Sequence, residues 1–261
     1  MLPTYKDKTM QTNTPQIRFK GFTEPWEIRK CKELCDITTG KSNTQDQSAN
    51  GIYPFFIRSD TPAKSNRYLY DDEAVITIGD GNIGRVFHYI NGKYDLHQRC
   101  YKMSNFRELI AKYFYYYFSA NFYKRAMTMT AKATVDSVRL DMIAEMDIMY
   151  PNSKKEQQKI GELFGNFDNL INLYGRKCES LKKIKKAMLY KMFPQNGESA
   201  PQIRFKGFTE PWQWCKVEDC MKTITDYVAA GSFADIAANV EYKNSPDYAQ
   251  LVRTVDLKHK F

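Results

Sequence analysis

Polar and basic side chains gather in segments of this sequence that have the composition of loops. Arginine and asparagine can each form two hydrogen bonds with the edge of a DNA base, while lysine, serine and threonine bind backbone phosphates. A nucleic acid is therefore the ligand that these residue types fit. The candidate contact residues are Lys41, Asn43, Arg58, Ser59, Asp60, Asn82, Arg85, Lys132 and Thr134.

A glycine-rich segment, Gly79–Gly84, matches the G-x-G-x-x-G pattern of dinucleotide-binding proteins. In those proteins the glycines join a strand to a helix. Here the residues that follow, RVFHYI at 85–90, have the composition of a strand. The segment is therefore predicted to be a turn between two strands, which can bring Asn82 and Arg85 close to a large ligand.

Constellations typical of enzymes are missing from the sequence. It has no H-E-x-x-H zinc site, no G-x-S-x-G nucleophile, no Walker loop and no N-P-P-Y motif for methyl transfer to amino groups. The acids between Asp60 and Glu73 lack a suitably spaced lysine, so we interpret them as part of a solvated loop. These absences favour a binding protein over an enzyme.

The cysteines give little support to a metal site. No two of them form a C-x-x-C pair, so we expect no bound metal and predict buried or half-buried, reduced thiols. They are Cys31, Cys35, Cys100, Cys178, Cys215 and Cys220.

The overall composition is that of a soluble, globular protein of one or two domains. The chain has 261 residues, of which 43% are apolar and 26% are charged. No stretch has the ~18 apolar residues that span a membrane, and the amino terminus lacks the apolar core of a signal peptide. We therefore expect a cytoplasmic protein without a membrane partner.

The net charge of +9 is concentrated in one segment. Residues 154–193 carry ten basic and four acidic residues, which is two thirds of the surplus. The lysines between Lys182 and Lys191 either contact phosphates or form a solvated helix face, and the sequence leaves both interpretations open.

A repeat defines the organisation of the chain. The segment PQIRFKGFTEPW occurs at Pro15–Trp26 and again, unchanged, at Pro201–Trp212. The offset of 186 residues is too long for a solenoid and indicates duplicated domains. The chain thus holds one unit, 15–200, and the first 61 residues of a second.

Within the first unit the sequence predicts a mixed domain of strands and helices. Apolar runs at 73–78 and 85–90 are typical of strands, and Asn91-Gly92 predicts a hairpin turn after them. Residues 105–127 are predicted to form a helix whose aromatic side chains belong to the core, not to a base-stacking platform. The predicted buried face consists of Leu109, Tyr113, Tyr116 or Tyr117, and Ala120.

A long helix follows and is predicted to end at Pro194. Its apolar residues are spaced alternately by four and three positions, which is the period of a coiled coil. Such a helix needs a partner helix, and the sequence contains no second segment of this kind. The predicted interface residues are Ile160, Phe164, Phe167, Ile171, Tyr174, Cys178, Leu181, Met188 and Met192.

These features, in this order, resemble the specificity subunit of type I restriction-modification systems. The resemblance rests on Gly21–Trp26, on Arg58-Ser59-Asp60 and on the GDGNIGRV turn at 79–86. Its most specific parts are the KEQQKI start of the long helix at Lys155 and the KMFP end at Pro194. It covers nearly the whole chain.

The resemblance implies a non-catalytic, sequence-specific DNA-binding subunit. A target recognition domain would read half of a bipartite site on double-stranded DNA, and the helix would dock methyltransferase subunits and, through them, the restriction subunit. S-adenosylmethionine, ATP and magnesium would belong to those partners, with no cofactor in this chain. The alternative is a free-standing DNA-binding regulator that uses the same domain.

The predicted fold class is α+β, with an amino-terminal tail at 1–13 and a mixed α/β target recognition domain at 14–153. A coiled-coil-type spacer helix follows at 154–194, and an incomplete second copy of the recognition domain at 195–261. In the family a second helix packs antiparallel on the first, so this chain is either shortened or works as a half-subunit. For a half-subunit we expect a homodimer through residues 160–192 and a palindromic split target, whose bases the sequence does not give.

Overall fold

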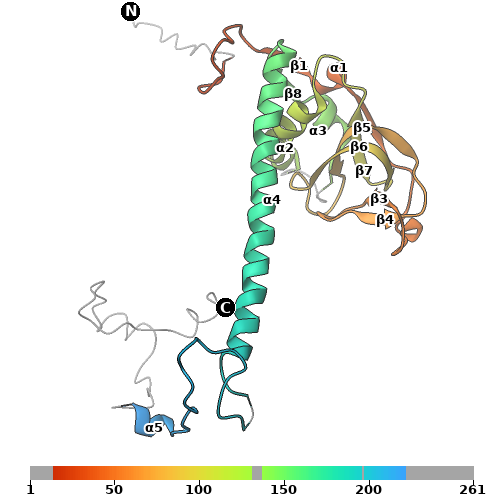
Figure 1. Ribbon diagram of the computed structural model, residues 1–261. Coiled ribbons are helices and arrows are strands. Elements are labelled where there is room, and N and C mark those ends of the chain that lie inside the picture. Colours follow the sequence, from red (N-terminus) through yellow and green to blue (C-terminus); the bar gives the residue numbers. More distant parts are fainter. Residues whose placement is uncertain (1–13, 131–136, 196, 222–261) are drawn as a thin grey trace, which may run out of the picture. The chain divides into compact units, whose positions relative to one another are not determined.

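The computed structural model describes residues 14–130, 137–195 and 197–221 (Figure 1). The chain falls into two compact units, divided between Leu181 and Lys182. The first unit contains both sheets and most of the long helix. The second contains the end of that helix and the second copy of the repeated segment.

A six-stranded sheet forms the larger part of the first unit. Its strand order is β2-β7-β5-β6-β3-β4, and every neighbouring pair is antiparallel except the parallel pair of β3 and β6. The strands are β2 (Asp36–Thr39), β3 (Tyr53–Phe56), β4 (Ala63–Ser65), β5 (Tyr70–Ile78), β6 (Phe87–Leu96) and β7 (Cys100–Ser104).

A second sheet joins the beginning and the end of this domain. β1 (Glu27–Lys30) pairs antiparallel with β8 (Asp147–Tyr150), and Glu27 stands opposite Tyr150. The first and last strands of the domain therefore lie side by side, close to the start of the long helix in Figure 1.

The helices complete the predicted fold class, which is confirmed as α+β with one long helix. α2 packs on β5 and β6, and α4 is the long helix that leads out of the domain (Figure 1). The helices are α1 (Cys31–Leu34), the 3-10 turn η1 (Thr44–Asp46), α2 (Ala111–Thr130), α3 (Leu140–Ala144), α4 (Lys154–Lys191) and α5 (Val217–Cys220).

Phenylalanines of α2 form the centre of the core. Phe114, Phe118 and Phe122 are fully buried and stack in series, with ring centroids 5.3 and 4.5 Å apart. Their spacing of four residues places them on one helix face. The prediction that this aromatic run belongs to the core is confirmed. The predicted face is only partly right, because Tyr113 is buried whereas Ala120 is exposed.

The start of α2 differs from the prediction of a helix from residue 105. Asn105 has φ +52°, a left-handed conformation that an α-helix does not accept. The backbone N–H of Ile110 donates to Oε1 of Gln157 at 2.7 Å, and α2 begins at the next residue, Ala111. A side chain from the start of α4 thus satisfies a donor at the start of α2.

The turn between β5 and β6 lies at residues 79–86. Gly81 and Gly84 have φ of +85° and +67° there, so the prediction of a glycine-rich turn between two strands is confirmed. The predicted hairpin at Asn91-Gly92 is wrong, because β6 continues through both residues and stays paired with β5. The strand tolerates φ +129° at Gly92, and the chain has already reversed direction.

Gln157 anchors the first turn of α4. Its side-chain Nε2 donates to the carbonyl oxygens of Glu108 at 3.0 Å and Pro151 at 2.8 Å, while its Oε1 accepts the bond from Ile110. A fully buried amide with all these partners fixes the direction in which the helix leaves the domain.

Two buried glycines allow α4 to approach α2 closely. A Cβ at Gly161 would lie 3.4 Å from both Lys112 Cβ and the backbone nitrogen of Tyr113. A Cβ at Gly165 would lie 3.3 Å from Lys112 Nζ. A large side chain at Gly161 therefore has no space without moving one of the helices.

The cysteines differ in part from the predicted buried or half-buried thiols. Cys31, Cys35 and Cys100 are buried thiols, but Cys178 is exposed. Cys215 and Cys220 form a disulfide, because α5 brings Cys220 back towards Cys215.

Within the described ranges, no helix is long and apolar enough to cross a membrane. In the same ranges, no three histidine, cysteine or acidic side chains converge to form a metal site.

Candidate nucleic-acid interface

Two arginines from different loops share one carboxylate. Arg58 Nη1 lies 3.1 Å from Asp80 Oδ2, and Arg99 Nη1 lies 2.9 Å from the same oxygen. The arginine side chains are 47% and 63% exposed, whereas that of Asp80 is only 18% exposed. We call these three residues the Asp80 cluster. The carboxylate orients both guanidinium groups and leaves other N–H donors facing solvent.

Gly79 holds the turn of Asp80 against the turn of Arg99. Its N–H donates to the carbonyl oxygen of Arg99 at 2.7 Å, and its own carbonyl oxygen accepts the N–H of Val138 at 2.7 Å. A Cβ at Gly79 would lie 2.6 Å from the Arg99 oxygen, so only glycine permits this approach.

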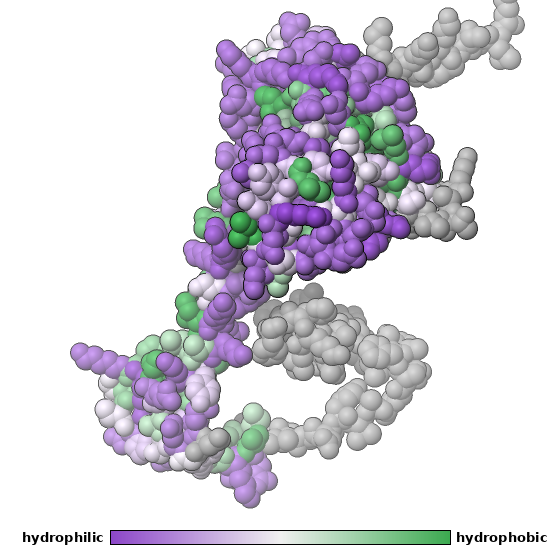
Figure 2. Space-filling model, turned by 90° about the vertical axis from the view of Figure 1, so that its right-hand side faces the viewer, coloured by the Kyte–Doolittle hydropathy of each residue, from purple (hydrophilic) through white to green (hydrophobic). Residues whose placement is uncertain are grey.

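The turn at 97–99 connects two further loops to the cluster. The N–H of His97 donates to Phe56 at the end of β3, and the N–H of Gln98 donates to Ser42 in the loop after β2, at 2.9 and 2.8 Å. The loops at 40–46, 57–61 and 79–86 thus meet at this turn. Figure 2 shows the face of the molecule that lies on the right-hand side of Figure 1; its surface is mainly hydrophilic, with small apolar groups.

A buried carboxylate supports the loop after β2. Asp95 is completely buried and accepts hydrogen bonds from Ser42 Oγ at 2.6 Å, from Ser65 Oγ at 3.3 Å and from the Leu96 N–H at 2.8 Å. A carboxylate is buried at acceptable cost only when donors surround it in this way. The loop backbone is therefore held in one position.

The charges of the Asp80 cluster affect the pKa of the neighbouring His97. Burial lowers its pKa, the charges of Arg58 and Arg99 lower it further, and Asp80 acts in the opposite direction. The imidazole therefore remains neutral at pH 7, and its Nδ1 accepts the N–H of Arg99 at 3.1 Å.

Arg85 is oriented by an aromatic ring of α2. Its Nη2 donates to the hydroxyl of Tyr123 at 2.6 Å, and its Cζ lies 4.3 Å from the centroid of the same ring. Arg85 and Asn82 are both exposed and lie in the same turn as Asp80.

The remaining predicted contact residues have different surroundings. Ser59 shapes its own loop, because its Oγ accepts the N–H of Thr61 and its carbonyl oxygen binds His88 Nε2. The N–H of Asn43 donates to Asp46 at 2.8 Å. The side chains of Lys41 and Asp60 are exposed.

Lys132 and Thr134 lie outside the described residues. Ser137, just beyond them, forms a bridge with Asp80. The structure thus brings Arg58 and the 79–86 turn together, and places Ser137 at the same turn.

Sequence analysis missed two members of the Asp80 cluster. Asp80 lies in the glycine-rich turn, from which only Asn82 and Arg85 are predicted as contact residues, and nothing in the sequence distinguishes Arg99 from other surface arginines. Asp80 could have been predicted as a partner of arginines, because it lies in a turn directly after a strand and arginines lie in other loops.

The predicted helix interface divides into a covered and an uncovered part. Ile160 packs against the core, whereas Phe164, whose ring lies 5.3 Å from that of Tyr116, remains 43% exposed. The next residues are exposed: Phe167 by 49%, Ile171 by 68%, Tyr174 by 63% and Leu181 by 55%. Cys178 is exposed as well, Met188 is 37% exposed and Met192 is half-buried.

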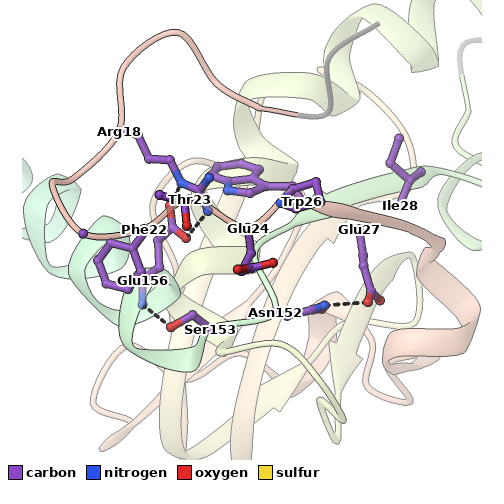
Figure 3. A pocket seen from close by; sticks show the side chains of 12 residues that line it. Arg18, Phe22, Thr23, Glu24, Trp26, Glu27, Ile28, Asn152, Ser153 and Glu156 are labelled. Carbon is purple, nitrogen blue, oxygen red and sulfur yellow. Dashed lines mark hydrogen bonds and ion pairs between the residues drawn. The ribbon is translucent and has the colours of Figure 1, made fainter. Parts of the chain in front are cut away.

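A cavity of about 780 Å³ lies between the first copy of the repeated segment and the start of α4 (Figure 3). Arg18 forms a double hydrogen bond with Glu156: Nε to Oε1 at 2.7 Å and Nη2 to Oε2 at 2.8 Å. Glu156 is completely buried, and its hydrogen bonds raise the pKa of Arg18. The repeat and the helix start are recognisable in the sequence, but nothing in the sequence pairs Arg18 with Glu156.

Comparison with known families gives a match over most of the domain and the helix. The family model described as Type I restriction modification DNA specificity domain matches residues 23–183.

Individual relatives point to the same family. The chain is similar to the Type I restriction enzyme EcoDI specificity subunit of Escherichia coli, with 23% identity over 182 residues, 69% of this chain and 40% of that protein. It is similar to the Type I restriction enzyme MjaVIII specificity subunit of Methanocaldococcus jannaschii, with 22% identity over 225 residues, 80% of this chain and 52% of that protein. The chain spans about half the length of these relatives.

A solved structure shares the fold. The S subunit of a type-I restriction-modification system from M. genitalium aligns with a TM-score of 0.57 and 18% identity, over 69% of this chain and 48% of that one. At this identity the likeness concerns the fold alone.

Proposed function

Because the chain belongs to the family of type I restriction modification DNA specificity domains, we propose that residues 14–153 are a target recognition domain that binds double-stranded DNA and reads half of a bipartite sequence. The observation that carries this proposal is the Asp80 cluster, where arginines from two loops present N–H donors from fixed positions. Arginine forms paired hydrogen bonds with guanine, which makes it a common base-reading residue.

The cluster suits base edges better than phosphates. Asp80 places a negative charge beside Arg58 and Arg99, and that charge disfavours the approach of a phosphate oxygen. A base edge is neutral, so it can bind the remaining donors of both arginines. Pre-orientation by the carboxylate also reduces the entropy lost on binding.

Other candidate residues would position the DNA backbone. Lys41 is exposed beside the cluster, and Lys132 and Thr134 precede the segment that returns to Asp80. Lysine and threonine bind phosphates without reading sequence. Asn82 and Arg85 lie in the same turn as Asp80 and would contact base edges, as would Asn43, Ser59 and Asp60 from the neighbouring loops.

The proposal assigns catalysis to other proteins. The helix at 154–194 would dock methyltransferase subunits and, through them, a restriction subunit, while 195–261 would begin a second recognition domain. S-adenosylmethionine, ATP and magnesium would bind to those partners. The name of the E. coli relative, a specificity subunit of a restriction enzyme, supports this division of labour.

We further propose that α4 pairs antiparallel with α4 of a second copy. The exposed seam from Phe167 to Leu181 supports this, because contiguous apolar surface on a helix is stabilised by packing against another helix. Two identical recognition domains related by twofold symmetry would read a palindromic split target.

The test is a selection of bound DNA from a random pool, with the purified chain and with a variant carrying Arg58→Ala and Arg99→Ala. We expect the wild-type pool to converge on a short motif and the variant pool to lose the bases that these arginines read. A wild-type pool without any motif would contradict the proposal.

A second measurement separates the proposal from a free-standing regulator. A specificity subunit should co-purify with a methyltransferase subunit when the two are expressed together, and the selected motif should then be methylated in the host DNA. A regulator would bind the same motif and retain no methyltransferase.

A further inference from the structure

The two copies of the repeated segment have the same backbone conformation. The matching glycines, Gly21 and Gly207, have φ of +96° and +97°, and the turns and bends fall at the same positions in both copies. We call Pro15–Trp26 the first docking segment and Pro201–Trp212 the second. Because the conformation is the same in two different surroundings, the segment's own sequence determines it.

The first docking segment is bound to the start of α4. Arg18 occupies the buried carboxylate of Glu156 through two hydrogen bonds. Lys159, one turn further along α4, lies 5.3 Å from the ring of Phe22 and 5.8 Å from that of Phe19. An arginine and two phenylalanines of the segment therefore make the contact, which we call the Glu156 site.

The second docking segment has the same three residues without such a site. Arg204, which matches Arg18, donates only to the carbonyl oxygen of Glu210 within its own segment, as far as the described residues go. Phe205 and Phe208, which match Phe19 and Phe22, are 72% and 66% exposed. The segment is thus a preformed ligand in which both phenylalanine rings face solvent and Arg204 is half-buried.

Its location suits a site at the start of another helix. The Ile203 N–H donates to the carbonyl oxygen of Lys191 at 3.0 Å, and the ring of Trp212 meets that of Phe193 at 5.8 Å. The second segment therefore folds against the last turn of α4. In an antiparallel pair of helices, the last turn of one helix lies beside the first turns of the other.

We propose that the second docking segment is an alternative ligand for the Glu156 site of a second copy of this chain. Arg204 of one copy would replace Arg18 at Glu156 of the other. The two segments are identical in sequence, so this exchange preserves every contact that the site makes. The inference rests on the antiparallel dimer proposed above and adds a residue from the partner copy to each site.

The test uses variants of the full chain that weaken the first segment. Arg18→Lys keeps the positive charge but loses the double hydrogen bond of the guanidinium group. We compare Arg18→Lys alone with Arg18→Lys/Arg204→Ala and with Arg18→Lys/Lys206→Ala. Lys206→Ala is the matched control, because this substitution also removes one positive charge from the second docking segment.

We expect Arg204 to sustain the dimer of the Arg18→Lys variant. Sedimentation equilibrium should show that adding Arg204→Ala weakens dimerisation by about tenfold or more, the effect of losing a charge-assisted hydrogen bond. Adding Lys206→Ala should change the dissociation constant less than twofold. Thermal unfolding should follow the same order at each protein concentration.

Equal dissociation constants for the two double variants would overturn the segment exchange and leave the helix pairing intact. A monomeric mass for every chain, the wild type included, would overturn the pairing and the exchange together. Should Arg18→Lys fail to fold, Arg204→Ala and Lys206→Ala are compared in the wild-type background, where the same inequality supports the exchange and equality overturns it.

Discussion

At the scale of single residues, the described loops combine exposed donors with partners that hold them. Arg58 and Arg99 form ion pairs with Asp80, and Arg85 donates a hydrogen bond to Tyr123. A long side chain held in this way loses less conformational entropy when it binds a base.

Removing one of these arginines should weaken binding to the selected DNA motif. We expect Arg58→Ala or Arg85→Ala to cost roughly 1 to 3 kcal/mol, the range for a residue that reads a base edge. Fluorescence anisotropy with the selected duplex and a scrambled duplex measures this. Lys20→Ala, an exposed charge in the first docking segment, is the control. Unchanged affinity in both arginine variants would place the base-reading surface elsewhere.

The half-buried His88 beside these loops should make stability depend on pH. Burial lowers the pKa of His88, and its bond to the Ser59 carbonyl oxygen only partly opposes this. As the pH falls, the His88 imidazole is therefore protonated in the unfolded chain before it is protonated in the folded chain. The free energy of unfolding decreases below about pH 6.5 as a result.

We expect the free energy of unfolding, measured in urea, to fall from pH 7 to pH 5, and to fall less in His88→Gln. Tyr150 and Arg29 lower the pKa of Glu108, and Asn105 and Arg107 lower that of Asp36, so these carboxylates act at more acidic pH. The same pH dependence in wild type and variant would show that His88 does not contribute.

Much of this site was visible from the sequence as residue types, but not as partnerships. The glycine-rich turn and Arg58 could be predicted because both lie in segments whose composition is that of loops, not of strands or helices. Arg99 and Glu156 could not, because the importance of each depends on a residue far away in the chain that only folding brings close.

At the scale of elements, the best prediction was α4 and the poorest was the turn at Asn91-Gly92. The spacing of apolar residues in α4 repeats over many turns, so a single residue that breaks the pattern does not change the prediction of a helix. A two-residue turn signal has no such redundancy. The glycine-rich segment before it reversed the chain first, and the sheet then held Asn91 and Gly92 within β6.

Glycines of α4 provide a test of how the helix is mounted on the domain. Gly161→Leu should lower the free energy of unfolding by about 1 to 3 kcal/mol, because its side chain would collide with Lys112 and Tyr113 of α2. Gly175→Ala is the matched control on the same helix, since nothing lies within 4 Å of its added Cβ. It should raise the stability by about 0.5 to 1 kcal/mol. If urea unfolding gave the same change in the free energy of unfolding for both variants, the α2–α4 contact would not contribute to stability.

At the scale of the whole molecule, we expect the exposed seam of α4 to determine the proposed dimer. Ile171→Glu places a charge at a residue that is 68% exposed in the single chain. It should therefore leave the fold intact and abolish the proposed dimer, with a monomeric mass in light scattering at concentrations where the wild type is dimeric. Asn169→Glu, on the opposite face of the helix, should remain dimeric. A dimeric Ile171→Glu chain would mean that the helices do not pair through this seam.

The adjacency of the domain's two ends would allow the recognition domain to be exchanged as one unit. β1 pairs with β8, and Arg18 meets Glu156, so everything between Trp26 and Pro151 forms a loop closed at its base. Recombination between genes that share the docking segment and the helix start could replace this cassette without disturbing either anchor. A different DNA specificity could then arise in a single genetic event, with both anchors of the domain preserved.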